Sequence, residues 1–201
     1  MLFVHRWALL ASGFAPVLLI MGWIVAGWLE GPAYDPSVQT ISVLAAYGAA
    51  GYWVMTCALL ALGACYVITA WGLRPAALGG RLALAGGGVV ALALTLIPAP
   101  SAGGSLRHGS VAAVGFFLMA AWPLLAAKDS SAVPWALRRR PSIAATAMMI
   151  AGAAWLLAEV RHHGPVGVAE RVVTAMQSLW PFIVVASCHR RNQRSPGGAR
   201  H

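Results

Sequence analysis

Two histidines and a glutamate stand close together, at spacings that would place them on one face of a helix. Glu159 lies three residues before His162 and four before His163, and residues so spaced are neighbours on a helix surface. Imidazole and carboxylate ligands together suit zinc or iron. A divalent metal is therefore the one cofactor that Glu159, His162 and His163 could hold, with His108 as a further candidate ligand. However, Gly164–Pro165 ends such a helix at once.

A serine, an aspartate and a histidine offer a second chemistry, hydrolysis. Ser42 could supply a nucleophile, and Asp35 and His108 the groups that accept its proton. His108 could instead pair with Glu170 or Asp35 and satisfy a polar patch, or relay protons, because histidine titrates near neutrality. The chain has no Gly-x-Ser-x-Gly, no His-Glu-x-x-His and no phosphate loop. The residues therefore favour a protein that is not an enzyme.

A polar stripe near the carboxyl end suggests a binding site. Glu170, Thr174, Gln177 and Ser178 recur every three or four residues, so they share one face of a helix. This face could line a cavity, or it could supply hydrogen bonds between helices. Ionisable residues at membrane level are functional candidates by default. The candidate binding residues are Asp35, Gln39, Ser42, His108, Glu170, Thr174, Gln177 and Ser178.

Six runs of mostly apolar residues must position these side chains. A helix of about 20 apolar residues crosses a bilayer core, and backbone in lipid must satisfy its own hydrogen bonds. We therefore predict an all-α fold, a bundle of six transmembrane helices. Thr40–Ala50, between the first two, has no helix breaker before Gly48 and could form a short further helix. The six predicted spans are Trp7–Leu29, Trp53–Gly72, Arg81–Ile97, Arg107–Ala127, Pro141–Val160 and Gly167–Ser187.

The distribution of charge predicts the orientation of the bundle. Only 9% of the residues are charged and 60% are apolar, and the net charge is +9. The basic residues lie in short loops, which excludes a nucleic-acid-binding face. If both termini are cytoplasmic, the outer segments hold three basic residues and the cytoplasmic segments eleven, as the positive-inside rule requires. The outer three are Arg107, Arg161 and Arg171; the others are Arg6, Arg74, Arg81, Lys128, Arg138, Arg139, Arg140, Arg190, Arg191, Arg194 and Arg200.

Composition also predicts the domain plan and the location. Residues 1–187 form a single transmembrane domain, and residues 188–201, rich in Arg, Gly and Pro, form a disordered cytoplasmic tail. The cytoplasmic Arg and Lys residues are expected to contact anionic lipid headgroups. With thirteen Arg, one Lys and many Ala, Gly and Pro, the chain fits a GC-rich bacterial genome, and hence a bacterial plasma membrane.

One segment carries a family resemblance. The stretch Tyr34-Asp35-Pro36-Ser37-Val38-Gln39-Thr40-Ile41-Ser42-Val43-Leu44-Ala45 resembles the signature of a bacterial multi-pass membrane family catalogued as a domain of unknown function (number nine-nine-eight). Ile97–Pro98, His108, Glu170–Arg171 and Trp180 fit the same order, so the resemblance covers about residues 7–187. It implies a six-helix membrane fold and no established activity. The family often has an acid directly after the serine, where this chain has Val43.

Three functions remain open at this point. The first is transport of a small molecule or handling of lipid through a polar cavity open to the outer face. The second is a non-catalytic assembly or interaction subunit that binds a protein partner. The third is a metal-dependent intramembrane hydrolase, by loose analogy with the ceramidase and progestin-receptor-like hydrolases, which place Ser, Asp and His near one membrane face.

Overall fold

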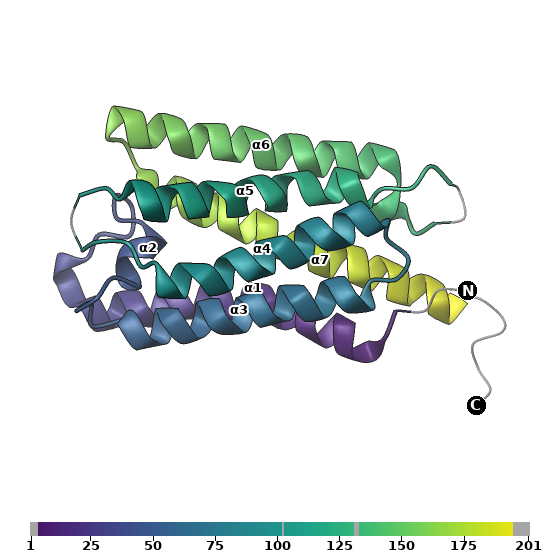
Figure 1. The fold of residues 1–201 in the computed structure, drawn as a ribbon, viewed down its shortest axis with the longest axis horizontal. Helices are drawn as coiled ribbons and strands as arrows, with labels where there is room; N and C mark the ends of the chain where they lie inside the picture. Colours follow the sequence, from purple (N-terminus) through teal and green to yellow (C-terminus); the bar gives the residue numbers. More distant parts are fainter. Residues whose placement is uncertain (1–3, 102, 131–132, 195–201) are drawn as a thin grey trace.

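The computed structural model describes residues 4–101, 103–130 and 133–194. These residues form six long helices and three short ones, without a strand (Figure 1). The six long helices are long and apolar enough to cross a membrane, which confirms the predicted all-α membrane fold. They are α1 (Arg6–Glu30), α3 (Tyr52–Gly72), α4 (Leu78–Leu96), α5 (Leu106–Ala126), α6 (Arg139–His162) and α7 (Val166–Arg194).

The short helices lie in the loops. The 3-10 helix η1 (Gly31–Ala33) follows α1, and the single-turn helix α2 (Ile41–Leu44) lies inside the stretch expected to be helical at Thr40–Ala50. The 3-10 helix η2 (Trp135–Leu137) precedes α6. The segment after α2 does not continue as a helix, because Gly48 adopts a positive φ of 86° that turns the chain toward α3.

Most helix ends agree with the predicted spans to within three residues, but the end of α7 does not. The apolar run ends at Ser187, yet α7 continues to Arg194. The predicted disordered tail is thus wrong for residues 188–194, because His, Arg, Asn and Gln are all compatible with a helix and no proline interrupts them. Residues 195–201 of that tail lie outside the described residues.

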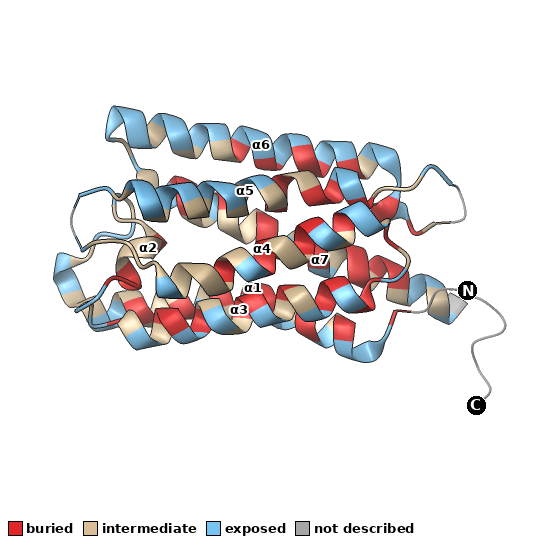
Figure 2. Ribbon diagram, in the orientation of Figure 1, coloured by how far each residue is buried: buried red, intermediate tan, exposed pale blue. Residues whose placement is uncertain are grey.

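The six long helices pack in chain order as a closed ring. Each contacts the next, and α7 closes the ring against α1. Small residues allow the closest contacts: a Cβ on Gly63 of α3 would lie 2.7 Å from the carbonyl oxygen of Gly88 on α4. Ala83, Gly87 and Ala91 of α4 are also buried, and such small residues let helix backbones approach closely. Large apolar side chains such as Trp53 and Phe117 are exposed instead. Exposed and buried stretches alternate along each long helix (Figure 2).

The connecting segments gather at two ends of the bundle. One end, here called the α2 end, carries residues 31–51, the loop from α4 to α5 and the turn from α6 to α7 (Figure 1). The other, the terminal end, carries the start of α1, the end of α7 and the two remaining loops. The three segments predicted to be outer therefore lie together, which places most candidate side chains at one end.

Candidate functional site

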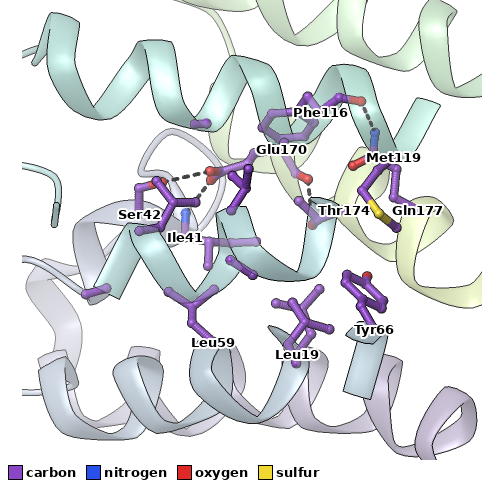
Figure 3. Close-up of a pocket in the computed structure, with 18 of the residues that line it drawn as sticks. Leu19, Ile41, Ser42, Leu59, Tyr66, Phe116, Met119, Glu170, Thr174 and Gln177 are labelled. Carbon is purple, nitrogen blue, oxygen red and sulfur yellow. Dashed lines mark hydrogen bonds between the residues drawn. The ribbon is translucent and has the colours of Figure 1, made fainter. Parts of the chain in front are cut away.

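A cavity of about 120 Å³ lies inside the helix ring toward the α2 end (Figure 3). Every long helix except α6 lines it, together with α2. Its wall is mostly apolar, with Leu19 from α1, Leu59 and Leu62 from α3, Leu94 from α4 and Met119 from α5. The polar side chains of the wall are Ser42, Tyr66, His108, Glu170, Thr174 and Gln177. The cavity thus combines an apolar body with a few convergent polar groups, as small-molecule sites do.

The carboxylate of Glu170 is the charged group of this cavity. It is 7% exposed, because the first turn of α7 lies beneath α2. The hydroxyl of Ser42 donates to Oε1 at 3.1 Å, and the backbone N–H of Ile41 donates to Oε2. Ile41 is the first residue of α2, whose N-terminal N–H groups have no partner within the helix. Glu170 therefore caps α2 from another helix and holds it over the cavity.

The next residue, Arg171, binds the loop that precedes α2 to α7 through hydrogen bonds. Its Nη1 donates to the carbonyl oxygens of Pro36 at 2.8 Å, Gln39 at 3.0 Å and Gly167 at 2.8 Å, and its Nη2 donates to the Tyr34 hydroxyl. Burial raises the pKa of Tyr34, while the nearby Arg171 charge opposes the shift. The loop from Tyr34 to Gln39 is therefore bound to α7 by a single guanidinium fork.

A glycine makes this close contact possible. A Cβ on Gly167 would collide with the carbonyl oxygens of Pro36 and Gln39, and the backbone N–H of Val168 donates to Ser37 at 3.1 Å. The backbones of the loop and of the start of α7 are therefore in direct contact. This contact determines how far α2 lies from the cavity.

His108 lines the cavity without pairing with an acid. Its Nδ1 lies 2.7 Å from the carbonyl oxygen of Ile97. A carbonyl only accepts hydrogen bonds, so Nδ1 carries a proton, and Nε2 is an acceptor whenever it carries none. Nε2 is buried with no partner among the described residues. The structure therefore does not pair His108 with Glu170 or Asp35, because Nδ1 bonds to the carbonyl oxygen of Ile97, directly after α4, and Nε2 has no hydrogen-bond partner.

Gln177 crosses the interior between two helices that are not neighbours in the ring. Its Nε2 donates to the carbonyl oxygen of Phe116 on α5 at 3.1 Å, and the side chain is 4% exposed (Figure 3). One turn earlier, the Thr174 hydroxyl donates to the Glu170 carbonyl at 2.8 Å. Ser178 is fully buried but does not line the cavity, and its hydroxyl donates to Ala175 of its own helix. The polar stripe of α7 thus divides between cavity wall and helix packing.

Two candidate residues form a turn outside the cavity. Oδ1 of Asp35, an exposed residue, accepts from the Ser37 hydroxyl at 2.6 Å and from its N–H at 2.8 Å. These hydrogen bonds lower the pKa of Asp35. The Oε1 of Gln39 accepts from the Asp35 N–H at 3.0 Å. Both side chains shape the loop and neither lines the cavity, so the structure does not bring Asp35 to Ser42 and His108.

The candidate metal ligands do not come together either. Oε1 of Glu159 accepts from Trp155 Nε1 at 2.7 Å on the same helix. His162 and His163 are exposed, and His163 ends α6 in the left-handed conformation with φ 54°. His108 lies in the cavity instead. Among residues 4–101, 103–130 and 133–194, no three His, Cys, Asp or Glu side chains are grouped to hold a metal.

Two features of the site escaped the sequence reasoning. Tyr66 lines the cavity from α3, a helix whose sequence shows no polar stripe, so no local signal marked it. The contact of Glu170 with α2 is made by the backbone N–H of Ile41, a group that every residue type except proline carries. The adjacent acid and base at 170–171 were the only sequence sign that this turn of α7 binds a loop.

Comparisons with known proteins identify a family and no more. No curated protein and no solved structure gave a significant match to this chain. One family model matches residues 14–187, which includes α2, the cavity wall and all six long helices apart from the outermost turns of α1 and α7. The chain belongs to the family described as "Protein of unknown function (DUF998)".

Proposed function

We propose that this protein binds a small, largely apolar molecule, or the apolar part of a lipid, in the cavity and moves or presents it at the membrane. The observation that carries the proposal is the cavity itself. Five of the six long helices line it, and its polar groups include the buried Glu170 and Nε2 of His108, which has no hydrogen-bond partner among the described residues. Side chains placed only for packing would close this space, because protein interiors are close-packed.

The segment from Tyr34 to Leu44 is the proposed entry. It covers the cavity with a single-turn helix, and its hydrogen bonds to α7 come from the side chains of Glu170 and Arg171 and from the backbone N–H of Val168. Short segments outside the long helices open locally before the packed helices do. A ligand would therefore pass beside α2, where Ser42 and Glu170 meet it first.

The orientation belongs to the same proposal. The start of α1 and the end of α7 lie at the end that carries most basic residues. We propose that this end is cytoplasmic, that the α2 end and its cavity face the outer side of a bacterial plasma membrane, and that the cytoplasmic Arg and Lys residues contact anionic headgroups.

Analysis of bound molecules tests the proposed function. Tag-free protein, purified in a mild detergent, should release a bound small molecule or lipid that mass spectrometry detects in stoichiometric amount. Gln177→Leu removes the amide that crosses the cavity and should lower that amount severalfold. Ser178→Ala, at a neighbouring buried position outside the wall, is the control and should retain it. Equal retention in both variants would contradict the proposed site, and a stoichiometric protein partner instead of a ligand would favour the assembly-subunit hypothesis.

One observation favours a hydrolase as the second candidate. The Ser42 hydroxyl donates to the Glu170 carboxylate at 3.1 Å, and His108 lines the same cavity. A serine beside a base can act as a nucleophile. A fluorophosphonate probe should then label the protein and fail to label Ser42→Ala. A wild-type chain that neither reacts with the probe nor hydrolyses lipid esters would leave Ser42 as an α2 residue held by Glu170.

A further inference from the structure

Among the described residues, the cavity wall holds one acidic side chain and no Lys or Arg. The acidic side chain is that of Glu170. Glu170 forms no ion pair within the described part of the chain, and the neighbouring Arg171 directs its guanidinium to the carbonyl groups of the loop. An ionised carboxylate in an apolar interior needs hydrogen bonds and an opposite charge to offset its lost hydration. The described residues supply the hydrogen bonds but no Lys or Arg side chain inside the cavity.

The hydrogen bonds of Glu170 leave acceptor positions of its carboxyl group free. Both oxygens of Glu170 accept, Oε1 from Ser42 and Oε2 from Ile41. A carboxylate has about four acceptor positions, so two donors leave room for a further one from the cavity. A ligand with an N–H or O–H group can supply such a donor.

The other polar groups near the ligand space are mainly acceptors as well. The Ser42 proton is given to Glu170, the Thr174 proton to a carbonyl of its own helix, and the Nδ1 proton of His108 to Ile97. What each has left is an oxygen lone pair or, for His108, the buried Nε2. Tyr66 and the second N–H of Gln177 are the donors that remain. The cavity is thus complementary to a group that donates several hydrogen bonds and is positively charged.

We infer that the ligand of this cavity carries a primary ammonium group on a short apolar body, with the ammonium at Glu170 and the body against the leucines of α1 and α3. The inference rests on the proposed function and adds its substrate class. An ammonium offers three donors and one positive charge. A free amphiphilic amine and the amino headgroup of a lipid share this chemistry.

Calorimetric titration of the full chain in a maltoside detergent tests the inference, with empty micelles as the partition control. The probes are hexylammonium, 1-hexanol and hexanoate, which share one apolar body and differ in the polar end. Hexylammonium should bind roughly tenfold or more tightly than hexanol, and hexanoate should bind weakest, because a buried charge pair is strongly coupled. Equal affinity for the ammonium and the alcohol would overturn the inference.

Matched variants assign the effect to one carboxylate. Glu170→Gln keeps an acceptor for Ile41 and should reduce the preference for hexylammonium over hexanol by about tenfold. Glu30→Gln is the control, since Glu30 accepts from the Gly51 N–H at 2.8 Å at the same end but lies outside the cavity; it should bind like wild type. A Glu170→Gln variant that folds and keeps the full preference would overturn the inference. If that variant does not fold, the wild-type comparison of the three probes decides.

The outcomes separate this inference from the proposed function. Binding of hexanol without a preference for the ammonium would leave the apolar cavity as a ligand site and remove only the charge requirement. Binding of none of the three probes would overturn both. Displacement of hexylammonium by phosphatidylethanolamine, but not by phosphatidylglycerol, would identify a lipid headgroup as the source of the amine, and lack of displacement by either would identify a free amine.

Discussion

Glu170 and Arg171 are adjacent in sequence but act on different sides of α7. Successive helix residues point about 100° apart, so Glu170 reaches the cavity and α2 while Arg171 reaches the loop that precedes α2. Between them they hold one continuous segment, from Tyr34 to Ser42, against the first turn of α7. The two side chains make different bonds, so their substitutions have separable effects.

Removal of the Glu170 carboxylate should release α2. In Glu170→Ala the Ile41 N–H and the Ser42 hydroxyl lose their acceptor, which costs about 1–3 kcal/mol for a buried polar group left without a partner. Glu170→Gln retains an amide oxygen and should lose less. Thermal unfolding of both variants in the same detergent measures the difference. Equal midpoints for the alanine and glutamine variants would show that the cap of α2 contributes nothing to stability.

The guanidinium of Arg171 should not be replaceable by an ammonium. Lysine keeps the charge but lacks the planar fork that reaches Pro36, Gln39 and Tyr34 together. We expect Arg171→Lys to destabilise the loop by about 1–3 kcal/mol, seen as faster amide hydrogen exchange at residues 35–42. The exposed Arg107, on α5 at the same end, provides the control Arg107→Lys. Unchanged exchange in Arg171→Lys would mean that charge alone holds the loop.

The sequence predicted the end of the bundle at which the polar residues lie. It predicted less well which of their side chains come into contact. Ser42, His108, Glu170 and Gln177 come together because their helices end at one face, which the span pattern predicted. The position of Asp35 was not predictable, because its side chain is captured by Ser37, two residues away. Such local turns compete with distant partners through geometry that residue types alone do not define.

Among the elements, α3 and α4 pack closely around a pair of glycines, Gly63 and Gly88. The backbones approach so closely that a Cβ on Gly63 would lie 2.7 Å from the Gly88 oxygen and 2.8 Å from Leu92 Cγ. One of these neighbours is backbone and cannot rotate away. Without a strong hydrophobic drive between helices in lipid, such close packing is a main source of stability.

Gly63→Ala should therefore separate α3 from α4. We expect a loss of about 1–3 kcal/mol from overpacking, measured by thermal unfolding in detergent. Gly109→Ala on α5 is the matched control, because nothing lies within 4 Å of its added Cβ, and alanine in an open helix position should be neutral or stabilising by about 0.5–1 kcal/mol. Similar unfolding midpoints for the two variants would show that α3 and α4 accommodate the added methyl group without a loss of stability.

The ends of the elements show what apolar length can and cannot predict. Five of the six helices start and end within three residues of the predicted spans, because Gly31, Pro98 and Gly164–Pro165 interrupt both the apolar run and the helix. The end of α7 differs because its apolar run stops at Ser187 while its backbone hydrogen bonding continues to Arg194. Hydropathy indicates where the membrane-spanning segment ends. Only helix-breaking and capping residues indicate where the helix itself ends.

The whole molecule is asymmetric along its long axis. An even number of long helices brings both described ends of the chain, near Arg6 and Arg194, to one end of the bundle (Figure 1). That end also carries Arg74, Lys128 and the Arg138–Arg140 run. The opposite end has the cavity, with Glu170 in its wall. Basic loops are retained in the cytoplasm during insertion, so the orientation determines which side supplies the ligand.

Single-cysteine labelling in intact cells should reveal this orientation. The native Cys57, Cys65 and Cys188 are replaced by alanine, and one new cysteine is added at an exposed position of either end, Ser101→Cys at the α2 end or Asp129→Cys at the terminal end. A membrane-impermeant maleimide should label Ser101→Cys in intact cells, and Asp129→Cys only after permeabilisation, because eleven of the fourteen basic residues favour retention of the terminal end. The reverse pattern would place the cavity toward the cytoplasm, and labelling of both variants in intact cells would show that the charge difference does not determine a single orientation. With the reverse pattern the search for an amine ligand would move from external to cytoplasmic molecules, since a cavity covered by α2 is reached from the side on which α2 lies.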